Sequence, residues 1–299
     1  MTRTTVGMPI VVGVDGSTSA RHAALWAAGM AARRHHPLRL VFACDSYAFG
    51  YAGGLAPPQS YFDELQAAGE LLLSAVETEI RRSHPDVEIV VEQQTAGPIP
   101  TLIEQSAGAR LLVVGSRASG GFRGILAGST AVALVAHGHC AVAVVRGAEP
   151  DSVPPAEGPV VVGVDGSATS DAAVATAFDE ASWRGAELVA LHSWLEYTSD
   201  TTLPRRFDAE WAQLEQNEEE LLAERLAGWQ EKYPDVVVRR MITQGRPVKR
   251  LLEHAAGAQL IVVGGRGHGG FSGMLLGSTS QALIYHAPCP LLVVRPNGG

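Results

Sequence analysis

The sequence has little cysteine and no long apolar run. Its three cysteines, Cys44, Cys140 and Cys289, form no CxxC pair and are too few for a disulfide framework, so reduced thiols are expected. The apolar run near the N-terminus is too short for a signal peptide, and no segment reaches the roughly 20 apolar residues of a membrane span. We therefore expect a cytoplasmic protein that does not act at a membrane.

Lysine is also scarce, and acidic residues outnumber basic ones. The chain has only two lysines, Lys232 and Lys249, and its formal net charge is -8. Nucleic acids and anionic membranes bind clustered positive charge, so neither is expected as a partner. A Walker-type phosphate loop needs a lysine directly after its glycines, and neither lysine stands in such a place.

What the chain does contain is an internal repeat. The segment PIVVGVDGSTSARHAALWAA from Pro9 matches PVVVGVDGSATSDAAVATAF from Pro159, and RLLVVGSRASGGF from Arg110 matches QLIVVGGRGHGGF from Gln259. A period this long indicates a duplicated domain rather than a solenoid. We expect domains over 1–147 and 159–299, joined by a linker rich in proline and acidic residues over 148–158.

Each half alternates short apolar runs with segments of helical spacing. In the first half the pattern predicts strands over 9–15, 38–44, 87–93, 110–116 and 140–146, and helices over 19–34, 99–109 and 129–137. Continuous apolar strands between helices indicate a parallel sheet covered on both faces. The predicted fold class is therefore α/β, with two tandem doubly wound domains.

Two further segments follow the second strand of each half, over 45–65 and 193–211. They have no clear period and are either surface connections or aromatic-rich flaps over a site. The acidic run that follows the second of them reads as a solvated amphipathic helix. Its apolar stripe consists of Leu214, Leu221, Leu222, Leu226 and Trp229.

A glycine-rich loop follows the fourth expected strand of the second half, in VVGGRGHGGFSGMLLGST over 262–279. A GxGxxG pattern is present at Gly265, but it follows the fourth strand rather than the first. No Asp or Glu occurs after Glu253 to hold a ribose, so an NAD site is excluded. What remains is a strand, a glycine loop and a helix start, with Ser278 expected as the N-cap.

Asp15 and Asp165 follow the first strand of each half. Ligands of open α/β sheets bind at the carboxyl ends of the strands, where the strand order switches. If strands one and four are neighbours there, the aspartate and the glycine loop face one crevice, which suits a nucleotide with ribose on the carboxylate and phosphates on the loop. Alternatively, the Asp-Gly-Ser turns and the serines after the loops only cap helices, and the glycines only allow close packing of helix on sheet.

At these residues the chain resembles the universal stress protein family. The family's ATP-binding members carry GxxG, nine residues, and then Gly followed by Ser or Thr. The second half fits with Gly264, Gly267, Gly277 and Ser278, whereas the first half has Ala118 in place of the second glycine. The stretches FDEAS and ELVALHSW are similar to the tandem-domain actinobacterial members. The resemblance covers both halves and implies five-stranded sheets of order 3-2-1-4-5, bound ATP and a homodimer.

The resemblance also implies two sets of binding residues. They are Gly13, Asp15, Cys44, Val114, Gly115, Ala118, Gly128, Ser129 and Thr130 in the first half, and Gly163, Asp165, Ser193, Val263, Gly264, Gly267, Gly277, Ser278 and Thr279 in the second. Arg117 and Arg266 either add positive charge or are solvated. Mg²⁺ is compatible with the phosphates, although no carboxylate cluster demands it.

Ala118 bears on the strength of the first site. If this position needs a positive φ, alanine costs about 1–2 kcal/mol there. That cost corresponds to roughly a tenfold loss of affinity. The second site is therefore expected to be the stronger one.

No catalytic set is found. HGHC at His137 lacks the HxGH-type motif and SGGF at Ser119 lacks the SGGxDS motif of ATP-using relatives of this fold. His137 recurs as His286 near a helix end but His139 is replaced by Pro288, which favours a helix C-terminal histidine over a metal ligand. We expect a non-enzymatic, ATP-binding regulator of the stress response with an unidentified protein partner. The alternatives are a chaperone-like or scaffolding protein with incidental nucleotide, or a weak ATPase.

Overall fold

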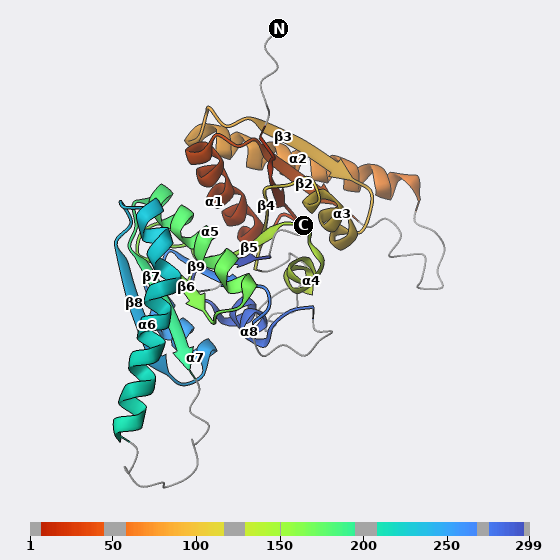
Figure 1. The fold of residues 1–299 in the computed structure, drawn as a ribbon. Helices are drawn as coiled ribbons and strands as arrows, with labels where there is room; N and C mark the ends of the chain where they lie inside the picture. Colours follow the sequence, from red (N-terminus) through yellow and green to blue (C-terminus); the bar gives the residue numbers. More distant parts are fainter. Residues whose placement is uncertain are drawn as a thin grey trace, which may run out of the picture. The chain divides into compact units, whose positions relative to one another are not determined.

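The computed structural model describes residues 7–44, 58–116, 129–149, 151–194, 208–267 and 275–295. Contacts divide the chain into two compact units, Met1–Pro154 and Pro155–Gly299. Within the described residues, both units have the same order of strands and helices (Figure 1).

The elements of each unit alternate between strand and helix. The first unit contains β1 (Ile10–Gly13), α1 (Thr18–Arg34), β2 (Leu38–Ala43), α2 (Gln59–Ser83), β3 (Ile89–Gln94), α3 (Pro98–Ser106), β4 (Leu111–Gly115), α4 (Ser129–His137) and β5 (Ala141–Val145). The second contains β6 (Val160–Val164), α5 (Ala168–Arg184), β7 (Leu188–Trp194), α6 (Asp208–Lys232), β8 (Val238–Gln244), α7 (Pro247–Ala255), β9 (Leu260–Gly264), α8 (Ser278–His286) and β10 (Leu291–Val294).

The strands of each unit pair in parallel. The order is β3-β2-β1-β4-β5 in the first unit and β8-β7-β6-β9-β10 in the second, which confirms the predicted order. The central strand β1 pairs with β2 on one side and β4 on the other, with Ile10 opposite both Leu38 and Leu111. β6 has the same place between β7 and β9. The strand order therefore switches beside β1 and β6, where ligands of such sheets bind.

Helices cover both faces of each sheet. In the first unit α1 packs on α2 and α3 packs on α4, and the second unit repeats this with α5 on α6 and α7 on α8. Successive residues of a strand point to opposite faces. Ile10, Val11 and Val12 are nevertheless all 0% exposed, and so are Val160, Val161 and Val162, because both faces are covered. The continuous apolar runs of the sequence have this cause.

Helix α2 was not predicted from the sequence, and helix α6 was expected only after the second irregular segment. They begin at Gln59 and Asp208, inside the two segments that were expected to be irregular. The greater part of those segments, with the possible flaps, lies outside the described residues. On α6, Leu222 and Leu226 are buried as predicted, but Leu221 is 43% exposed. Adjacent helix positions lie about 100° apart, so Leu221 and Leu222 cannot both face the sheet.

No helix within the described ranges combines the length and the apolar character needed to cross a bilayer.

Candidate functional site

The two aspartates lie directly after the central strands, each in a tight turn that leads into a helix. Ser17 and Ser167 are the N-caps of α1 and α5, and their side chains accept hydrogen bonds from the backbone N–H groups three residues on. Oδ1 of Asp165 in turn accepts from the backbone N–H (3.0 Å) and the hydroxyl (2.7 Å) of Ser167. Asp15 and Ser17 repeat both distances. One oxygen of each carboxylate therefore shapes the turn, as the helix-cap alternative requires.

Gly115 and Gly264 end the fourth strand of each unit, and packing requires both of them to be glycine. A Cβ at Gly264 would lie 2.8 Å from the backbone carbonyl carbon of Thr169, in the first turn of α5. A Cβ at Gly115 would lie 2.6 Å from the same atom of Ser19 in α1. At these two positions the glycine allows close approach of helix to strand, which was the alternative to a ligand-binding role.

Gly267 is required for a different reason. A Cβ there would collide with Oδ2 of Asp165, so the absence of a side chain lets the glycine loop lie against the carboxylate. The φ angle of Gly267 lies outside the positive range that favours glycine. The cost expected for alanine in a positive-φ conformation therefore does not apply at Gly267. The glycine is explained by its neighbour rather than by its own backbone conformation.

The helix after the loop begins differently from the prediction. The N-cap of α8 is Gly277, which forms no side-chain capping hydrogen bond, and Ser278 is the first helical residue. The prediction of Ser278 as the cap was therefore wrong by one residue, because the Gly277 carbonyl already accepts from Gln281 N–H at 2.9 Å. The N–H groups of residues 278–280 precede this first helical hydrogen bond and carry the positive end of the helix dipole.

These parts enclose a cleft of about 350 Å³ in the second unit. Its lining includes all nine of the predicted second-half residues, namely Gly163, Asp165, Ser193, Val263, Gly264, Gly267, Gly277, Ser278 and Thr279. A volume of this size is within the range of small-molecule sites. The tertiary structure thus brings together residues that are more than a hundred positions apart in the sequence.

Several lining residues were not among the predicted binding residues. They are Val164, Ser170, Leu191, Pro247, Leu251, Arg266 and Ser280. Pro247 and Leu251 lie one turn apart on α7 and form an apolar wall, with no signal in the sequence beyond ordinary helix spacing. Arg266 was considered as a source of charge, and it lines the cleft with Asp165 as a side chain of opposite sign.

In the first unit the described candidate residues on the strands lie at the equivalent edge of the sheet. Gly13 and Gly115 end β1 and β4, and Ser129 and Thr130 open α4. Val114 is 5% exposed on β4, next to β1. Ala118, Gly128 and Arg117 lie outside the described residues.

The strand register shows which residues of the two second strands are equivalent. Gly13 lies opposite Val41 and Gly163 lies opposite Leu191. Two residues further along each second strand, Ala43 is therefore the counterpart of Ser193. Cys44, the candidate of the first half, corresponds to Trp194.

Among the described side chains, no group of three or more His, Cys, Asp and Glu residues could hold a metal ion. His137 and His286 lie in the last turns of α4 and α8, as expected for helix C-terminal histidines.

The universal stress protein family model matches residues 8–146 and again 158–295. The chain belongs to the universal stress protein family. Two universal stress proteins of Mycobacterium tuberculosis are similar to this chain. One is 40% identical over an alignment of 312 residues, and the other is 38% identical over 293 residues. The first match covers 96% of this chain and 94% of the relative, and the second covers 96% of both. The resemblance inferred from the glycine motifs is thereby confirmed.

Solved structures agree on the fold. A universal stress protein from Archaeoglobus fulgidus superposes with a TM-score of 0.67 at 21% identity, over 98% of this chain and 100% of its own. Another universal stress protein was solved in complex with cAMP; it is 25% identical, has a TM-score of 0.36, and covers 47% of this chain and 98% of its own.

Proposed function

We propose that this universal stress protein binds ATP in the cleft of its second domain and acts as a regulator through its nucleotide-bound state. The observation that carries the proposal is the convergence of all nine second-half candidate residues on one cleft. A second, weaker ATP site is proposed in the first domain, at the equivalent edge of its sheet.

The chemistry of the cleft fits a nucleotide in three parts. Leu191, Leu251 and Val263 offer an apolar wall for a base, and Asp165 offers a carboxylate acceptor for ribose hydroxyls. The start of α8 and the glycine loop offer backbone N–H groups for phosphates. Gly267 leaves no side chain between loop and carboxylate, so phosphate and ribose groups of one ligand can reach both. Arg266 would add positive charge near the phosphates, and Mg²⁺ would accompany them through phosphate oxygens.

A regulatory role is favoured over catalysis. Asp165 and Arg266 are the ionisable side chains among the lining residues within the described chain, and an arginine does not exchange protons at neutral pH. Among the described lining residues there is therefore no acid–base pair to activate water. We further propose a cytoplasmic homodimer whose nucleotide state is recognised by a protein partner. A scaffolding role with incidental nucleotide, or slow ATP hydrolysis, is the alternative.

The test is to denature the purified protein with acid, identify the released small molecules, and count ATP per chain. We expect ATP to be released, with a larger loss in Asp165→Ala than in Asp15→Ala. Glu253→Ala removes an exposed carboxylate of α7 that pairs with Lys249 and Arg250, and serves as a control that should retain the nucleotide. No released ATP, together with no binding of added ATP, would overturn the proposal.

The same variants distinguish the alternatives. If Asp165→Ala loses both its bound ATP and its effect on stress survival, the regulatory role is supported. Survival that persists without ATP supports the scaffold, and stoichiometric turnover that is lost in Asp165→Ala supports the ATPase.

A further inference from the structure

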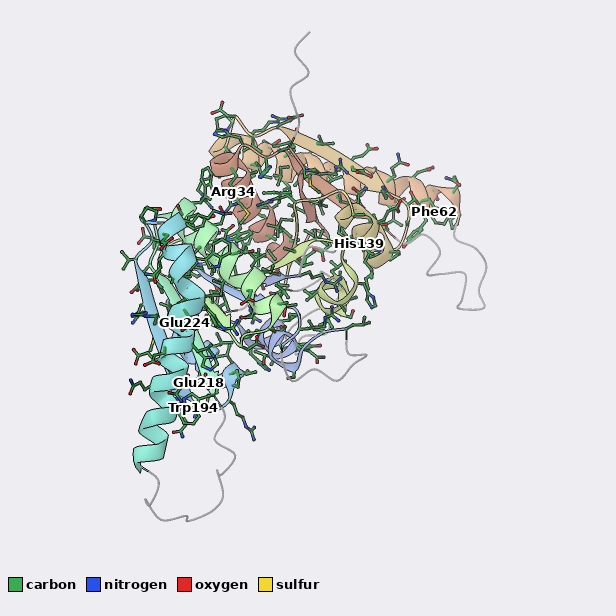
Figure 2. The ribbon with its side chains drawn as sticks, in the orientation of Figure 1. Arg34, Phe62, His139, Trp194, Glu218 and Glu224 are labelled. Atoms are coloured by element: carbon green, nitrogen blue, oxygen red, sulfur yellow. The ribbon has the colours of Figure 1, made fainter. Side chains whose placement is uncertain are left out.

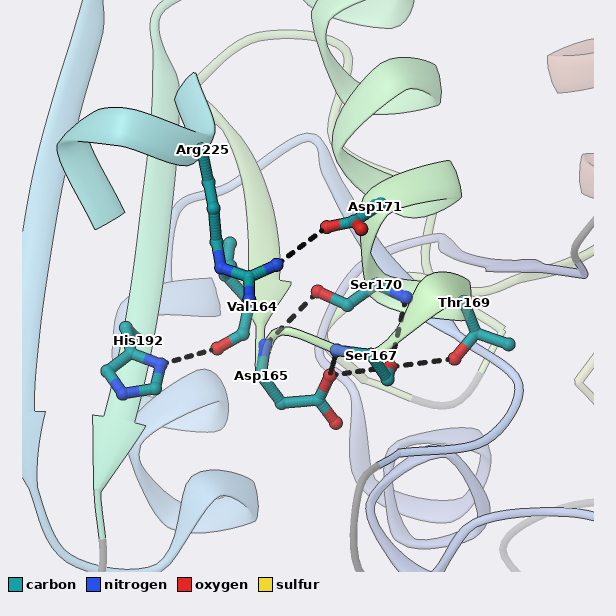
Figure 3. A network of polar contacts seen from close by, with 8 residues as sticks. All are labelled: Val164, Asp165, Ser167, Thr169, Ser170, Asp171, His192 and Arg225. Atoms are coloured by element: carbon teal, nitrogen blue, oxygen red, sulfur yellow. Dashed lines mark hydrogen bonds and ion pairs between the residues drawn. The ribbon is translucent and has the colours of Figure 1, made fainter. Parts of the chain in front are cut away.

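One peptide group beside the cleft is held at both ends by side chains. The carbonyl oxygen of Val164 lies 2.8 Å from Nδ1 of His192, and the N–H of Asp165, in the same peptide group, donates to Oγ of Ser170 at 3.1 Å. Figure 3 shows these two contacts on either side of the turn that carries Asp165. Because this peptide precedes the Asp165 side chain directly, its orientation sets the direction of the carboxylate.

The other ring nitrogen of His192 also faces an acceptor. Nε2 lies 3.2 Å from Oε2 of Glu218, and the two side chains are 17% and 26% exposed. Figure 2 shows Glu218 on α6, near the end of β7 that is marked by Trp194. A carbonyl and a carboxylate oxygen only accept hydrogen bonds, and a neutral imidazole has only one N–H. Both contacts are therefore made together only by the imidazolium form of His192.

The first domain has neither side chain. Register places Phe42 at the position of His192, because Val41 and Leu191 lie opposite the equivalent glycines Gly13 and Gly163. The N-caps Ser17 and Ser167 are likewise equivalent, and three residues after them come Ala20 and Ser170. Phenylalanine and alanine side chains cannot form these hydrogen bonds, so the two domains differ at this peptide.

The surroundings of His192 contain few other charged groups. Leu191 and Ser193 line the cleft together with Pro247 and Leu251 of α7, so His192 points to the opposite face of the sheet, away from the charges of α7. Its partner in register on β8 is Ile242. On α6, the described charged residues that are not exposed to solvent are Glu218 and Arg225. Asp165, which precedes α5, and Asp171, in its first turn, are exposed. Arg225 is bound by Asp171 at 3.1 Å.

We infer that His192 is a positioning residue for the second nucleotide site, and that its protonated form, bridging Val164 and Glu218, strengthens ATP binding in the second domain only. This inference rests on the proposed function. When the imidazolium loses a proton, the carboxylate, as the stronger acceptor, retains the remaining N–H. The Nδ1 lone pair then faces the Val164 carbonyl, the peptide is released, and ATP affinity falls. The fall therefore accompanies the loss of the imidazolium proton as the pH rises.

The experiment measures ATP affinity by calorimetry in the Asp15→Ala background, where the second domain is the proposed remaining site. Affinity is compared at about pH 6 and about pH 8, on either side of ordinary histidine titration. His192→Gln keeps an amide donor for Val164 that does not titrate, and Glu218→Gln removes the carboxylate from the surface of α6. The phosphates of free ATP titrate in the same way whichever protein is assayed. The ratio of the variant's ATP affinity to the parent's at each pH therefore isolates the contribution of His192.

Between the two pH values, we expect the ATP affinity of the parent to fall about fivefold more than that of either variant. A fivefold change corresponds to the net free energy of about one hydrogen bond. Nitrogen-15 NMR of the histidine ring should show both nitrogens protonated at about pH 6. Equal pH profiles in the parent and His192→Gln, or an unprotonated Nδ1, would overturn the inference while the proposed function stood. If the Asp15→Ala protein binds no ATP at either pH, the proposed function of the second domain fails instead, whatever the NMR shows of the ring.

Discussion

Asp165 and Gly267 are a pair of residues that determine each other's environment. The carboxylate has one oxygen engaged by Ser167 and the other directed at the glycine loop. A loop residue with any side chain would displace that second oxygen. The residue that aligns with Gly267 in the first half is Ala118, so the sequences of the two halves differ at this position.

We predict that Gly267→Ala weakens ATP binding at the second site about tenfold. The new methyl group forces Asp165 to move, and overpacking of this kind costs about 1–3 kcal/mol. Calorimetric titration in the Asp15→Ala background measures the effect. Because the displaced group is a side-chain terminus, the thermal midpoint should stay close to that of the parent. ATP affinity equal to the parent's would contradict the role given to Asp165.

The reciprocal change is made at the aligned position of the first half. Ala118→Gly should raise ATP affinity there by a similar factor of about ten, measured in the Asp165→Ala background. An unchanged affinity would show that the weakness of the first site has another source, such as the absent side-chain contacts at Phe42 and Ala20.

At the scale of elements, the two domains use opposite charges to connect the same pair of helices. Arg21 of α1 makes a two-bond ion pair with Glu79 of α2, whereas Asp171 of α5 pairs with Arg225 of α6. Arg21 and Asp171 are both the fourth residue of their helices. The pairing of the helices is thus retained while the sign of each partner is reversed. Arg225 also lies against Gly166, which connects α6 to the turn that carries Asp165.

The ion pair of the first domain should contribute little to stability. The hydrogen bond from Arg21 lowers the pKa of Glu79, so the contribution is present at neutral pH and is lost as the pH falls through the folded pKa. Both side chains are partly exposed, so we predict that Glu79→Gln lowers the free energy of unfolding by less than about 1 kcal/mol at pH 7. Denaturant unfolding at neutral and acidic pH measures this, and the difference should vanish in acid.

A buried pair on α5 provides the comparison. Glu180 and Arg184 are each 6% exposed, and Arg184 also donates to Gln259. Glu180→Gln leaves a buried arginine without its carboxylate and should cost about 3 kcal/mol or more. Equal effects of Glu79→Gln and Glu180→Gln would contradict the assignment of stability to burial rather than to charge pairing.

At the scale of the whole molecule, the two units share a fold but differ in the residues that prepare the ligand site. The second unit has Gly267, His192 and Ser170 where the first has Ala118, Phe42 and Ala20. A ligand that binds only the folded state stabilises it by mass action, by about 2.7 kcal/mol at a hundredfold excess over Kd. Binding should therefore protect the two units unequally.

We predict that ATP, at a concentration that saturates only the second site, slows amide hydrogen exchange in peptides from β6, β9 and α8. Peptides from β1, β4 and α4 should respond only at higher ATP. Asp165→Ala should abolish the first response and leave the second. Protection that begins in the first unit would show that the ranking of the two sites is wrong.

Much of the fold could be predicted from local pattern. The apolar runs of β1, β4, β6 and β9 and the glycines after them indicated parallel strands, since only buried central strands are apolar on both faces. Helix α2 was missed because its buried positions Gly69, Leu73, Val76 and Ile80 are embedded in a mostly exposed helix. The equivalence of Ala43 and Ser193 came only from the strand register, because the second strands have diverged in sequence.

The sequence by itself determined the duplication, the α/β class and the residue types of the candidate site, because these depend on spacing along the chain. Only the tertiary structure decided which atoms meet: Gly267 against Asp165, His192 between Val164 and Glu218, and Pro247 with Leu251 as the wall of the cleft. These contacts join different strands, helices and loops. Their distances depend on strand register and helix packing, which no local spacing in the sequence records.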